Sequence, residues 1–318
     1  MLKFAVLEVT DKCNLRCKHC YGGFTGNTFL SSKEKSIVLD NLKDVGCERV
    51  TLSGGEPFLA DIDLFDFAKQ FKENNIKVGV VTNGTLITNY PAAMYSVFDY
   101  IQISLDGPKK IHEMIRGVGT FDKAVESGKY LKASGHNVAF QITINHINQY
   151  SFNETFDIAK NLGIQLSVER TSRTGNASKM ENIDYANYQN ILKTIVDEKL
   201  LSSDPLVNAT ACKMASITPP QDIIRGCSAG KDGIAISSNL DVYPCVRLRI
   251  QGLGNLKNEK LSAILDGYHC RIINDRSRLK GKCGCCKMKY ICGGCRADAW
   301  IEYNDYLEED KGCLYDFE

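Results

Sequence analysis

The stretch Thr10-Asp11-Lys12-Cys13-Asn14-Leu15-Arg16-Cys17-Lys18-His19-Cys20 decides how the chain is organised, because it holds three cysteines spaced C-x3-C-x2-C. It follows an apolar run, residues 2–9, that is bounded by a turn and is typical of a buried strand. We therefore expect this cysteine loop, residues 10–20, at the carboxyl end of a first strand. Three thiolates can bind three irons of a four-iron cluster and leave the fourth iron open to an outside ligand.

The composition is that of a globular protein. Its 318 residues, 43% of them hydrophobic, can form the core of one large or two ordinary domains. The 39 Lys and Arg residues nearly balance the 38 Asp and Glu residues, so no overall charge favours nucleic acid or an anionic membrane as a partner. No leader precedes Leu2, and no apolar stretch approaches the roughly 20 residues that span a bilayer. We expect a cytoplasmic protein.

The 14 cysteines favour metal binding over disulfides, because thiols in the cytoplasm are kept reduced. Clustered soft ligands indicate iron–sulfur or zinc sites. Three cysteines lie in the cysteine loop, one is Cys47, and the other ten lie beyond residue 211. We therefore expect metal chemistry at both ends of the chain.

The first half of the chain alternates apolar strands with amphipathic helices. Six such units in a row predict a parallel sheet covered by helices, and six are too few for a closed eight-stranded barrel. The fold class that we expect is α/β, a partial (βα)6 barrel. The predicted strands span residues 2–10, 49–53, 77–82, 100–105, 138–145 and 165–169, and the predicted helices span 32–45, 62–73, 92–97, 121–133 and 153–162.

Polar and glycine-rich segments follow three of the predicted strands: Gly54-Gly55-Glu56-Pro57, Thr82-Asn83-Gly84, and Ser104-Leu105-Asp106-Gly107-Pro108. Glycines let a backbone come close to a ligand, and Glu56 adds a charge at the same edge. Each segment alone is typical of an ordinary turn. Their placement at successive strand ends beside the cysteine loop predicts one shared site there.

The rest of the chain is rich in cysteine. A helix is expected over residues 184–201 and a proline-containing bridge, not a packed element, over 202–221. We expect a boundary near residue 205, between a barrel domain (1–204) and a small cysteine-rich domain (205–318). Residues 234–237 and 241–243 predict a β-hairpin between Cys227 and Cys245. The pattern Cys283-x2-Cys286-x5-Cys292-x2-Cys295-x17-Cys313 indicates metal, although zinc ribbons share such spacing.

The first half resembles the radical S-adenosylmethionine (SAM) superfamily in three features. They are the C-x3-C-x2-C loop, Gly54-Gly55-Glu56-Pro57, and the segment from Ile103 to Pro108 with His112 and Arg116-Gly117. The resemblance implies that Cys13, Cys17 and Cys20 ligate a four-iron cluster whose open iron binds S-adenosylmethionine, which is cleaved to a 5′-deoxyadenosyl radical. It also implies that Gly54, Gly55 and Glu56 meet the methionine amino group of the cofactor. Ser104 and Arg116 are candidates for its ribose and carboxylate, and Asn145 is a further cofactor-side candidate.

The last third resembles the SPASM extension of radical SAM enzymes that modify peptides and proteins. That resemblance implies two auxiliary four-iron clusters, hence three clusters in all. The outer auxiliary cluster would be held by Cys283, Cys286, Cys292 and Cys313, and the inner one by Cys227, Cys245 and Cys295.

The chain departs from the SPASM pattern in three places. Leu240 stands where the family has glycine, the last close pair is C-x2-C where C-x3-C is usual, and residues 219–226 lack a fourth inner-cluster cysteine. The inner cluster is then either open to substrate or reached by Cys212.

Four cysteines have no assigned cluster. Cys47 is expected to be a buried thiol, and Cys285 lies between two proposed ligands. Cys212 and Cys270 are candidates to return a hydrogen atom to a substrate radical; for each the alternative is a small buried side chain.

These features predict an oxidoreductase that abstracts hydrogen from a peptide or protein and leaves a crosslink or another modification. The chain begins at its first strand, so a peptide substrate is expected to need a separate leader-binding protein or direct docking, and a flavodoxin or ferredoxin is the expected electron donor. Two alternatives remain: a radical epimerase or dehydrogenase acting on a small molecule such as an aminoglycoside, and a non-enzymatic zinc or iron–sulfur module. Zinc at the cysteine loop would prefer four closed ligands, and no fourth cysteine lies near.

Overall fold

The computed structural model describes residues 2–201, 207–209, 226–249 and 252–313. The expected domain boundary near residue 205 and the hydrogen-donor candidate Cys212 lie outside these residues.

A single twisted sheet organises the described part of the chain, and its strands follow the order β10-β9-β8-β1-β2-β3-β4-β5-β6-β7. Strands β8 and β1 to β7 run parallel to one another, whereas β9 pairs antiparallel with β8 and β10 pairs antiparallel with β9. The strands are β1 (Phe4–Thr10), β2 (Arg49–Gly54), β3 (Lys77–Thr82), β4 (Tyr100–Ser104), β5 (Val138–Ile144), β6 (Gln165–Arg170), β7 (Val207–Ala209), β8 (Gly233–Ile236), β9 (Asp241–Tyr243) and β10 (Gly254–Asn255).

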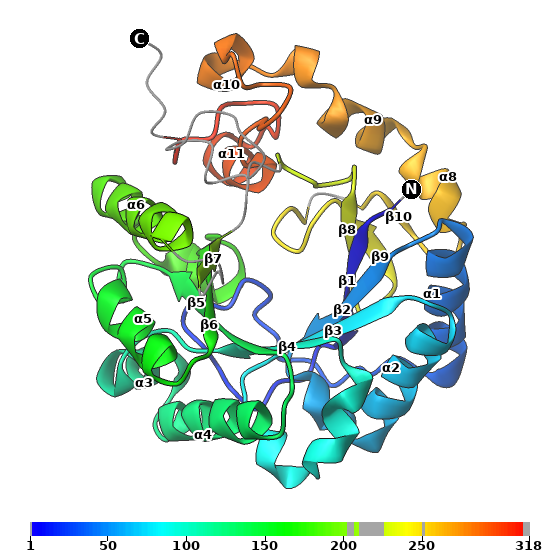
Figure 1. Cartoon of the computed structure of the whole chain (residues 1–318). Helices are drawn as coiled ribbons and strands as arrows, with labels where there is room; N and C mark the ends of the chain where they lie inside the picture. The colour runs from blue at the N-terminus through cyan, green and yellow to red at the C-terminus, as the bar shows by residue number, and fades with distance from the viewer. Residues whose placement is uncertain (1, 202–206, 210–225, 250–251, 314–318) are drawn as a thin grey trace.

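The helices cover the outer face of this sheet and then continue towards its open side (Figure 1). The α-helices are α1 (Ser32–Asp44), α2 (Ile62–Glu73), α3 (Lys109–Arg116), α4 (Thr120–Ala133), α5 (Phe152–Asn161), α6 (Tyr185–Leu201), α8 (Leu261–Leu265), α9 (Tyr268–Asn274), α10 (Gly281–Cys285) and α11 (Arg296–Tyr303). Short 3-10 helices are η1 (Pro57–Ala60), η2 (Ile87–Asn89), η3 (Ala92–Val97), η4 (Gly175–Lys179) and η5 (Arg276–Arg278).

The predicted partial barrel is confirmed. The sequence signals that predicted its helices and strands are local and strong. Helix α1 begins after Ser31, whose side chain accepts a hydrogen bond from the Glu34 backbone while the Glu34 carboxylate accepts one from Ser31, a complete capping box. One continuous apolar core joins the strands to the helices, with Leu7, Leu52 and Phe140 among its fully buried members.

Strand β7 corrects one expectation. Residues 207–209 were predicted to belong to a loose bridge, but they pair in parallel with β6, from Leu166 opposite Val207 to Val168 opposite Ala209. A three-residue strand carries too short a periodic signal to be read from its sequence.

The cysteine-rich part contributes to the same sheet. The predicted hairpin is confirmed as β8 and β9, and β8 pairs in parallel with β1 from Phe4 opposite Gly233 to Leu7 opposite Ile236. Gly233 permits this pairing, because a Cβ there would lie 2.2 Å from the Phe4 ring. Strands β8 and β7 therefore flank the six predicted strands, and helices α10 and α11 lie on the side between these two edges (Figure 1).

Candidate metal centres

Gly54 and Gly55, at the end of β2, let the cysteine loop lie against this strand. The Gly55 N–H donates to the Thr10 carbonyl and the Glu56 N–H to the Lys12 carbonyl, each at 2.9 Å. A Cβ on Gly55 would lie 1.9 Å from the Lys12 carbonyl oxygen, and Gly54 has a φ of 126°. Both positions therefore require glycine, since a side chain would push the loop away from the strand.

The end of β3 holds the loop from a second side. Asn83 Nδ2 donates to Asn14 Oδ1 at 2.8 Å, and Asn14 Nδ2 donates to Thr85 Oγ1 at 2.8 Å. The rim segments after β2 and β3 thus meet at the cysteine loop, as the sequence predicts.

A third support comes from the polar, turn-rich segment after β6. The Asn176 side chain donates to the Cys17 carbonyl at 3.1 Å, and its backbone N–H donates to the Cys20 carbonyl at 2.9 Å. Gly175, with a φ of 55°, lets the two backbones come close, because a Cβ there would lie 2.4 Å from the Tyr21 carbonyl oxygen. The Gly-Asn dipeptide within a turn-rich stretch was the available signal.

A buried charged network lies behind the loop. Asp106 is fully buried and accepts hydrogen bonds from His19 Nε2 at 2.8 Å, Arg116 Nε at 2.5 Å and the Thr143 N–H at 2.9 Å. Although burial opposes ionisation, the charges of Arg116 and His19 hold the pKa of the Asp106 carboxyl well below its usual range. Asp106 therefore fixes two side chains that face the cysteines.

His112 has a supporting position in the same network. Its Nδ1 accepts the Asp106 N–H at 3.1 Å, and burial lowers the pKa of His112 to about 4. The ring is therefore neutral at ordinary pH, which agrees with a structural role.

The three thiols of the loop share one electrostatic environment. Burial raises the pKa of the Cys17 thiol to about 11; nearby Arg116 opposes this shift, and the charges of Cys20 and Cys13 add to it. Arg116 Nη1 lies 3.8 Å from Cys17 Sγ. Bound iron would stabilise these thiolates, so the donor set fits a cluster with three protein ligands.

A site for a single metal ion would need several ligand side chains around one point. Within the described residues, no group of three Cys, His, Asp or Glu side chains is arranged to hold one metal ion. A four-iron cluster instead distributes its thiolates over separate irons.

The other predicted cofactor residues lie on neighbouring strand ends. Glu56 is fully buried and accepts hydrogen bonds from Thr82 Oγ1 at 2.8 Å and the Asn83 N–H at 2.8 Å. Burial raises the pKa of Glu56 to about 7. Ser104 is buried at the end of β4, and Asn145, just beyond β5, accepts the Ile147 N–H at 2.9 Å.

The thiols of the cysteine-rich part separate into two groups. Cys295 belongs to a small apolar cluster with Leu248 and Ile273, against which Cys245 packs. Burial raises the pKa of the Cys245 thiol, Arg247 opposes this shift, and the charge of Cys227 adds to it. Cys283 lies in a second apolar cluster with Leu279 and Leu307. The resemblance assigns Cys245 and Cys295 to the inner ligand set and Cys283 to the outer one, and this assignment stays a prediction.

Cys292 and Cys313 lie with the second group. Burial raises the pKa of Cys292 to about 12, and the charges of Cys313 and Cys283 add to the shift. Two backbone segments are joined here, because the Cys227 N–H donates to the Cys292 carbonyl at 2.9 Å. The two groups are therefore neighbours.

The remaining predicted residues differ in exposure. Cys286 Sγ accepts the Met288 N–H at 3.2 Å, and Cys285 beside it is exposed. Cys47 is buried in the core, as expected. Cys270 is buried on α9, and burial raises its pKa to about 11, so this thiol keeps its proton.

The structure shows how the chain accommodates Leu240, one of its departures from the family pattern. Its backbone is left-handed, with a φ of 68°, at a position where the family has glycine. Its side chain is fully buried, so apolar packing offsets the backbone strain.

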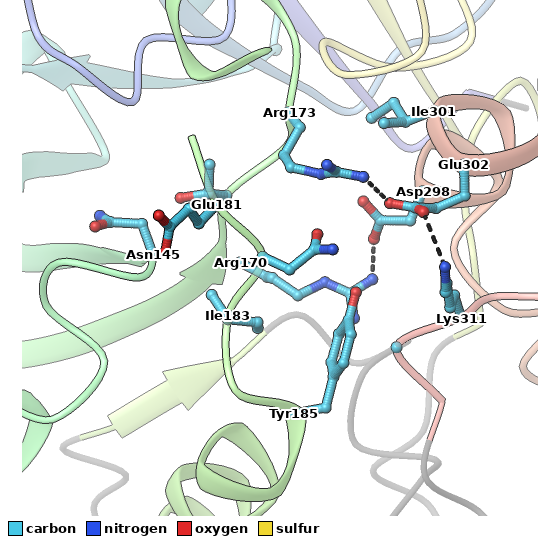
Figure 2. A pocket seen from close by; sticks show the side chains of 13 residues that line it. Asn145, Arg170, Arg173, Glu181, Ile183, Tyr185, Asp298, Ile301, Glu302 and Lys311 are labelled. Carbon is cyan, nitrogen blue, oxygen red and sulfur yellow. Dashed lines mark hydrogen bonds and ion pairs between the residues drawn. The ribbon is translucent and has the colours of Figure 1, made fainter. Parts of the chain in front are cut away.

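A pocket lies between the carboxyl ends of β5 and β6 and helix α11 (Figure 2). Arg170, at the end of β6, pairs with Asp298 of α11 and donates to Asp310 at 3.1 Å. Arg173 pairs with Glu302, which Lys311 approaches at 3.4 Å from the other side. Side chains of both charges therefore line the pocket and join the barrel to the cysteine-rich part.

Matches to protein families agree with these sites. Residues 7–160 match the radical SAM superfamily, and residues 227–287 match the SPASM family, described as an iron–sulfur cluster-binding domain. The chain contains a radical SAM domain followed by a SPASM domain. None of the helices in the described residues combines the length and apolar character that crossing a membrane requires.

Similar proteins include enzymes with different substrates. The AdoMet-dependent heme synthase of Methanosarcina barkeri is 29% identical, covering 97% of this chain and 95% of that protein. The mycofactocin maturase MftC of Mycobacterium tuberculosis is 31% identical, but over 53% of this chain and 44% of that protein. Among solved structures, Streptococcus suis SuiB bound to its precursor peptide SuiA has a TM-score of 0.79 at 19% identity, covering 98% of this chain and 76% of that chain. The last likeness concerns the fold alone.

Proposed function

We propose that this radical SAM/SPASM enzyme oxidises a peptide or protein substrate, using one four-iron cluster on the cysteine loop and two auxiliary clusters. The observation that carries the reaction class is the cysteine loop, whose three thiols are held by the ends of β1, β2 and β3 and by the segment after β6. When bound, the cluster and S-adenosylmethionine would supply a 5′-deoxyadenosyl radical that abstracts a hydrogen atom from the substrate.

The residues around the loop would orient the cofactor. Glu56, once ionised, is a suitable partner for the cofactor ammonium group, and Gly54 and Gly55 give its backbone access to the same place. Ser104 is our candidate for the ribose, and Asn145 is a further one. Arg116 is our candidate for binding the cofactor carboxylate. Its guanidinium would then contact both that carboxylate and Asp106.

The cysteine-rich part would hold the two auxiliary clusters. Cys227, Cys245 and Cys295 are the proposed inner ligands. Cys283, Cys286, Cys292 and Cys313 are the proposed outer ligands, and Cys270 is a candidate hydrogen donor, since its thiol stays protonated. Electrons would enter from a flavodoxin or ferredoxin.

The mixed charge of the pocket beside α11 supports a peptide substrate. Arg173 and Lys311 alternate there with Glu181 and Glu302, a lining that suits the polar backbone and charged side chains of an extended peptide. A separate leader-binding protein would complete such a system.

A tetrapyrrole substrate is the second candidate. It is favoured by the likeness to heme synthase, which extends over nearly the full length of both chains.

The reaction class is tested by anaerobic reconstitution with iron and sulfide, followed by reduction and incubation with S-adenosylmethionine. We expect 5′-deoxyadenosine to form in the wild type and not in the variant with Cys13, Cys17 and Cys20 all changed to Ala. A colourless protein that contains zinc and does not cleave S-adenosylmethionine would overturn the proposal.

The substrate is tested with the short peptide encoded nearest to this gene and, in parallel, with iron-coproporphyrin III. Loss of two hydrogens from the peptide supports a crosslink, whereas one deuterium gained in heavy water indicates epimerisation. Turnover of the porphyrin with no change in the peptide would contradict the peptide proposal and establish the second candidate.

A further inference from the structure

Three arginines, Arg296 fully buried and Arg116 and Arg247 half-buried, each direct a guanidinium nitrogen to the sulfur of a proposed cluster ligand. The nitrogen–sulfur distances are 3.8 Å from Arg116 to Cys17, 3.3 Å from Arg247 to Cys295, and 3.5 Å from Arg296 to Cys283. The three cysteines belong to three different proposed clusters, so each cluster would have one arginine.

Among the described residues, no carboxylate forms an ion pair with Arg296. Its side chain is fully buried, and its Nη1 donates to the carbonyl oxygens of Tyr306 and Glu308 at 2.8 and 2.6 Å. Its Nε is buried without a hydrogen-bond partner in the described part of the chain. A buried cation that contacts neutral carbonyls and a sulfur is stabilised if that sulfur belongs to an anionic cluster.

Arg247 is in a similar position at the other auxiliary group. Its Nη1 donates to the Arg170 carbonyl at 3.3 Å, and Asp298, which is already paired with Arg170, lies 4.0 Å away. Its Nη2 contacts Cys295 at the shorter distance of 3.3 Å. Here too a proposed cluster sulfur is in direct contact with the guanidinium.

The arginine at the cysteine loop differs, because Asp106 balances its charge at 2.5 Å. A cation beside a cluster favours the reduced, more negative state, and hydrogen bonds to cluster sulfurs also raise the reduction potential. Balanced charge at the loop would leave that cluster strongly reducing, whereas the less fully balanced charges of Arg247 and Arg296 would favour electron acceptance at the other two.

We propose that Arg247 and Arg296 are positioning residues for electron uptake, each raising the potential of one auxiliary cluster: Arg247 the inner and Arg296 the outer. The inference rests on the proposed function, because it needs both auxiliary clusters. It also assigns Cys295 and Cys283 to different clusters.

The test is a redox titration of the reconstituted full chain, followed by electron paramagnetic resonance, with iron counted in each sample. We expect Arg247→Gln and Arg296→Gln each to lower the potential of one auxiliary cluster, and not the same one. The expected shift is about tenfold in the reduction equilibrium, about 59 mV for a one-electron couple. The exposed Arg271→Gln on α9 is the matched control and should move neither cluster.

The lysine variants separate charge from folding. Arg247→Lys and Arg296→Lys keep the positive charge, so each should shift the reduction potential of the same cluster by less than the corresponding glutamine variant. If a glutamine variant loses iron, the lysine variant tests the inference in its place. Unchanged potentials with full iron content, or both variants moving one cluster, would refute the inference. If the wild type lacks auxiliary clusters, the proposed function itself fails.

Discussion

The two cysteine-containing regions are built in opposite ways. In the barrel, three thiols lie within eight residues of one loop, and the ends of β2 and β3 hold that loop by backbone and side-chain hydrogen bonds. In the cysteine-rich part, each proposed ligand set combines segments far apart in sequence, such as Cys245 with Cys295 and Cys283 with Cys313. The first site is local and rigid, whereas the second depends on how its segments dock.

The two regions also differ in how the charges of their arginines are balanced. Arg116 is balanced by Asp106, while Arg296 contacts a sulfur and neutral carbonyls. The comparison suggests that the barrel generates the radical in a fixed setting and that the cysteine-rich part determines where the electron goes. Each of the following experiments can break or sharpen this division.

The largest effect should come from removing one ligand in each region. Cys17→Ala should abolish 5′-deoxyadenosine formation, because no other thiol of the loop can replace it. Cys283→Ala should retain that activity but lose substrate oxidation, and Cys47→Ala, a buried control outside both sites, should keep both. Chromatographic assay of 5′-deoxyadenosine checks this prediction. An equal loss of 5′-deoxyadenosine formation in Cys17→Ala and Cys283→Ala would show that the two regions do not have separate roles.

Breaking the contact between the regions should cost stability. Arg170→Gln leaves the buried Asp310 and the half-buried Asp298 without their common partner, so we expect the free energy of unfolding to fall by about 3–5 kcal/mol. Chemical denaturation of the reconstituted protein measures this. Lys109→Gln, which removes an exposed partner of Asp122, is the control and should leave the midpoint unchanged; a similar midpoint in both variants would contradict the prediction.

A smaller loss is expected from Gly55→Ala, since its Cβ would collide with the Lys12 carbonyl. We expect about 2–3 kcal/mol of destabilisation and a drop of about four irons per chain, with the auxiliary clusters retained. Iron and sulfide assays with denaturation check both. In Gly252→Ala the added Cβ would make only ordinary contacts, so this control should retain all iron.

The smallest effect concerns pH. Because burial raises the pKa of Glu56 to about 7, its carboxyl is largely protonated at pH 6, and binding a cationic amino group must displace that proton. Affinity for S-adenosylmethionine should therefore rise about tenfold from pH 6 to pH 8, relative to Glu56→Gln. Calorimetric titration of both proteins measures the difference, and parallel pH profiles would show that Glu56 does not meet the amino group.

The barrel could be predicted from sequence because its signals are local. Apolar strands, the cap at Ser31 and glycine-rich strand ends each act within a few residues, so six predicted units agree with the structure. Helix α3 was missed, since Lys109–Arg116 directly follows the turn signals at Gly107 and Pro108.

Long-range contacts could not be predicted in the same way. The pairing of β8 with β1 joins residues more than 200 positions apart, and nothing near either strand specifies its partner. The same limit applies to Arg247 and Arg296, which read as ordinary arginines until the fold brings them to Cys295 and Cys283. The support from Asn176 to the cysteine loop was hidden for the same reason.

The most direct test of the account is the iron content of the anaerobically reconstituted chain, compared with the variant lacking Cys13, Cys17 and Cys20. We predict about twelve irons per wild-type chain and about eight in the variant, with spectra of four-iron clusters in both. About four irons in the wild type and none in the variant would contradict the account, because the cysteine-rich part would then hold no cluster to receive an electron.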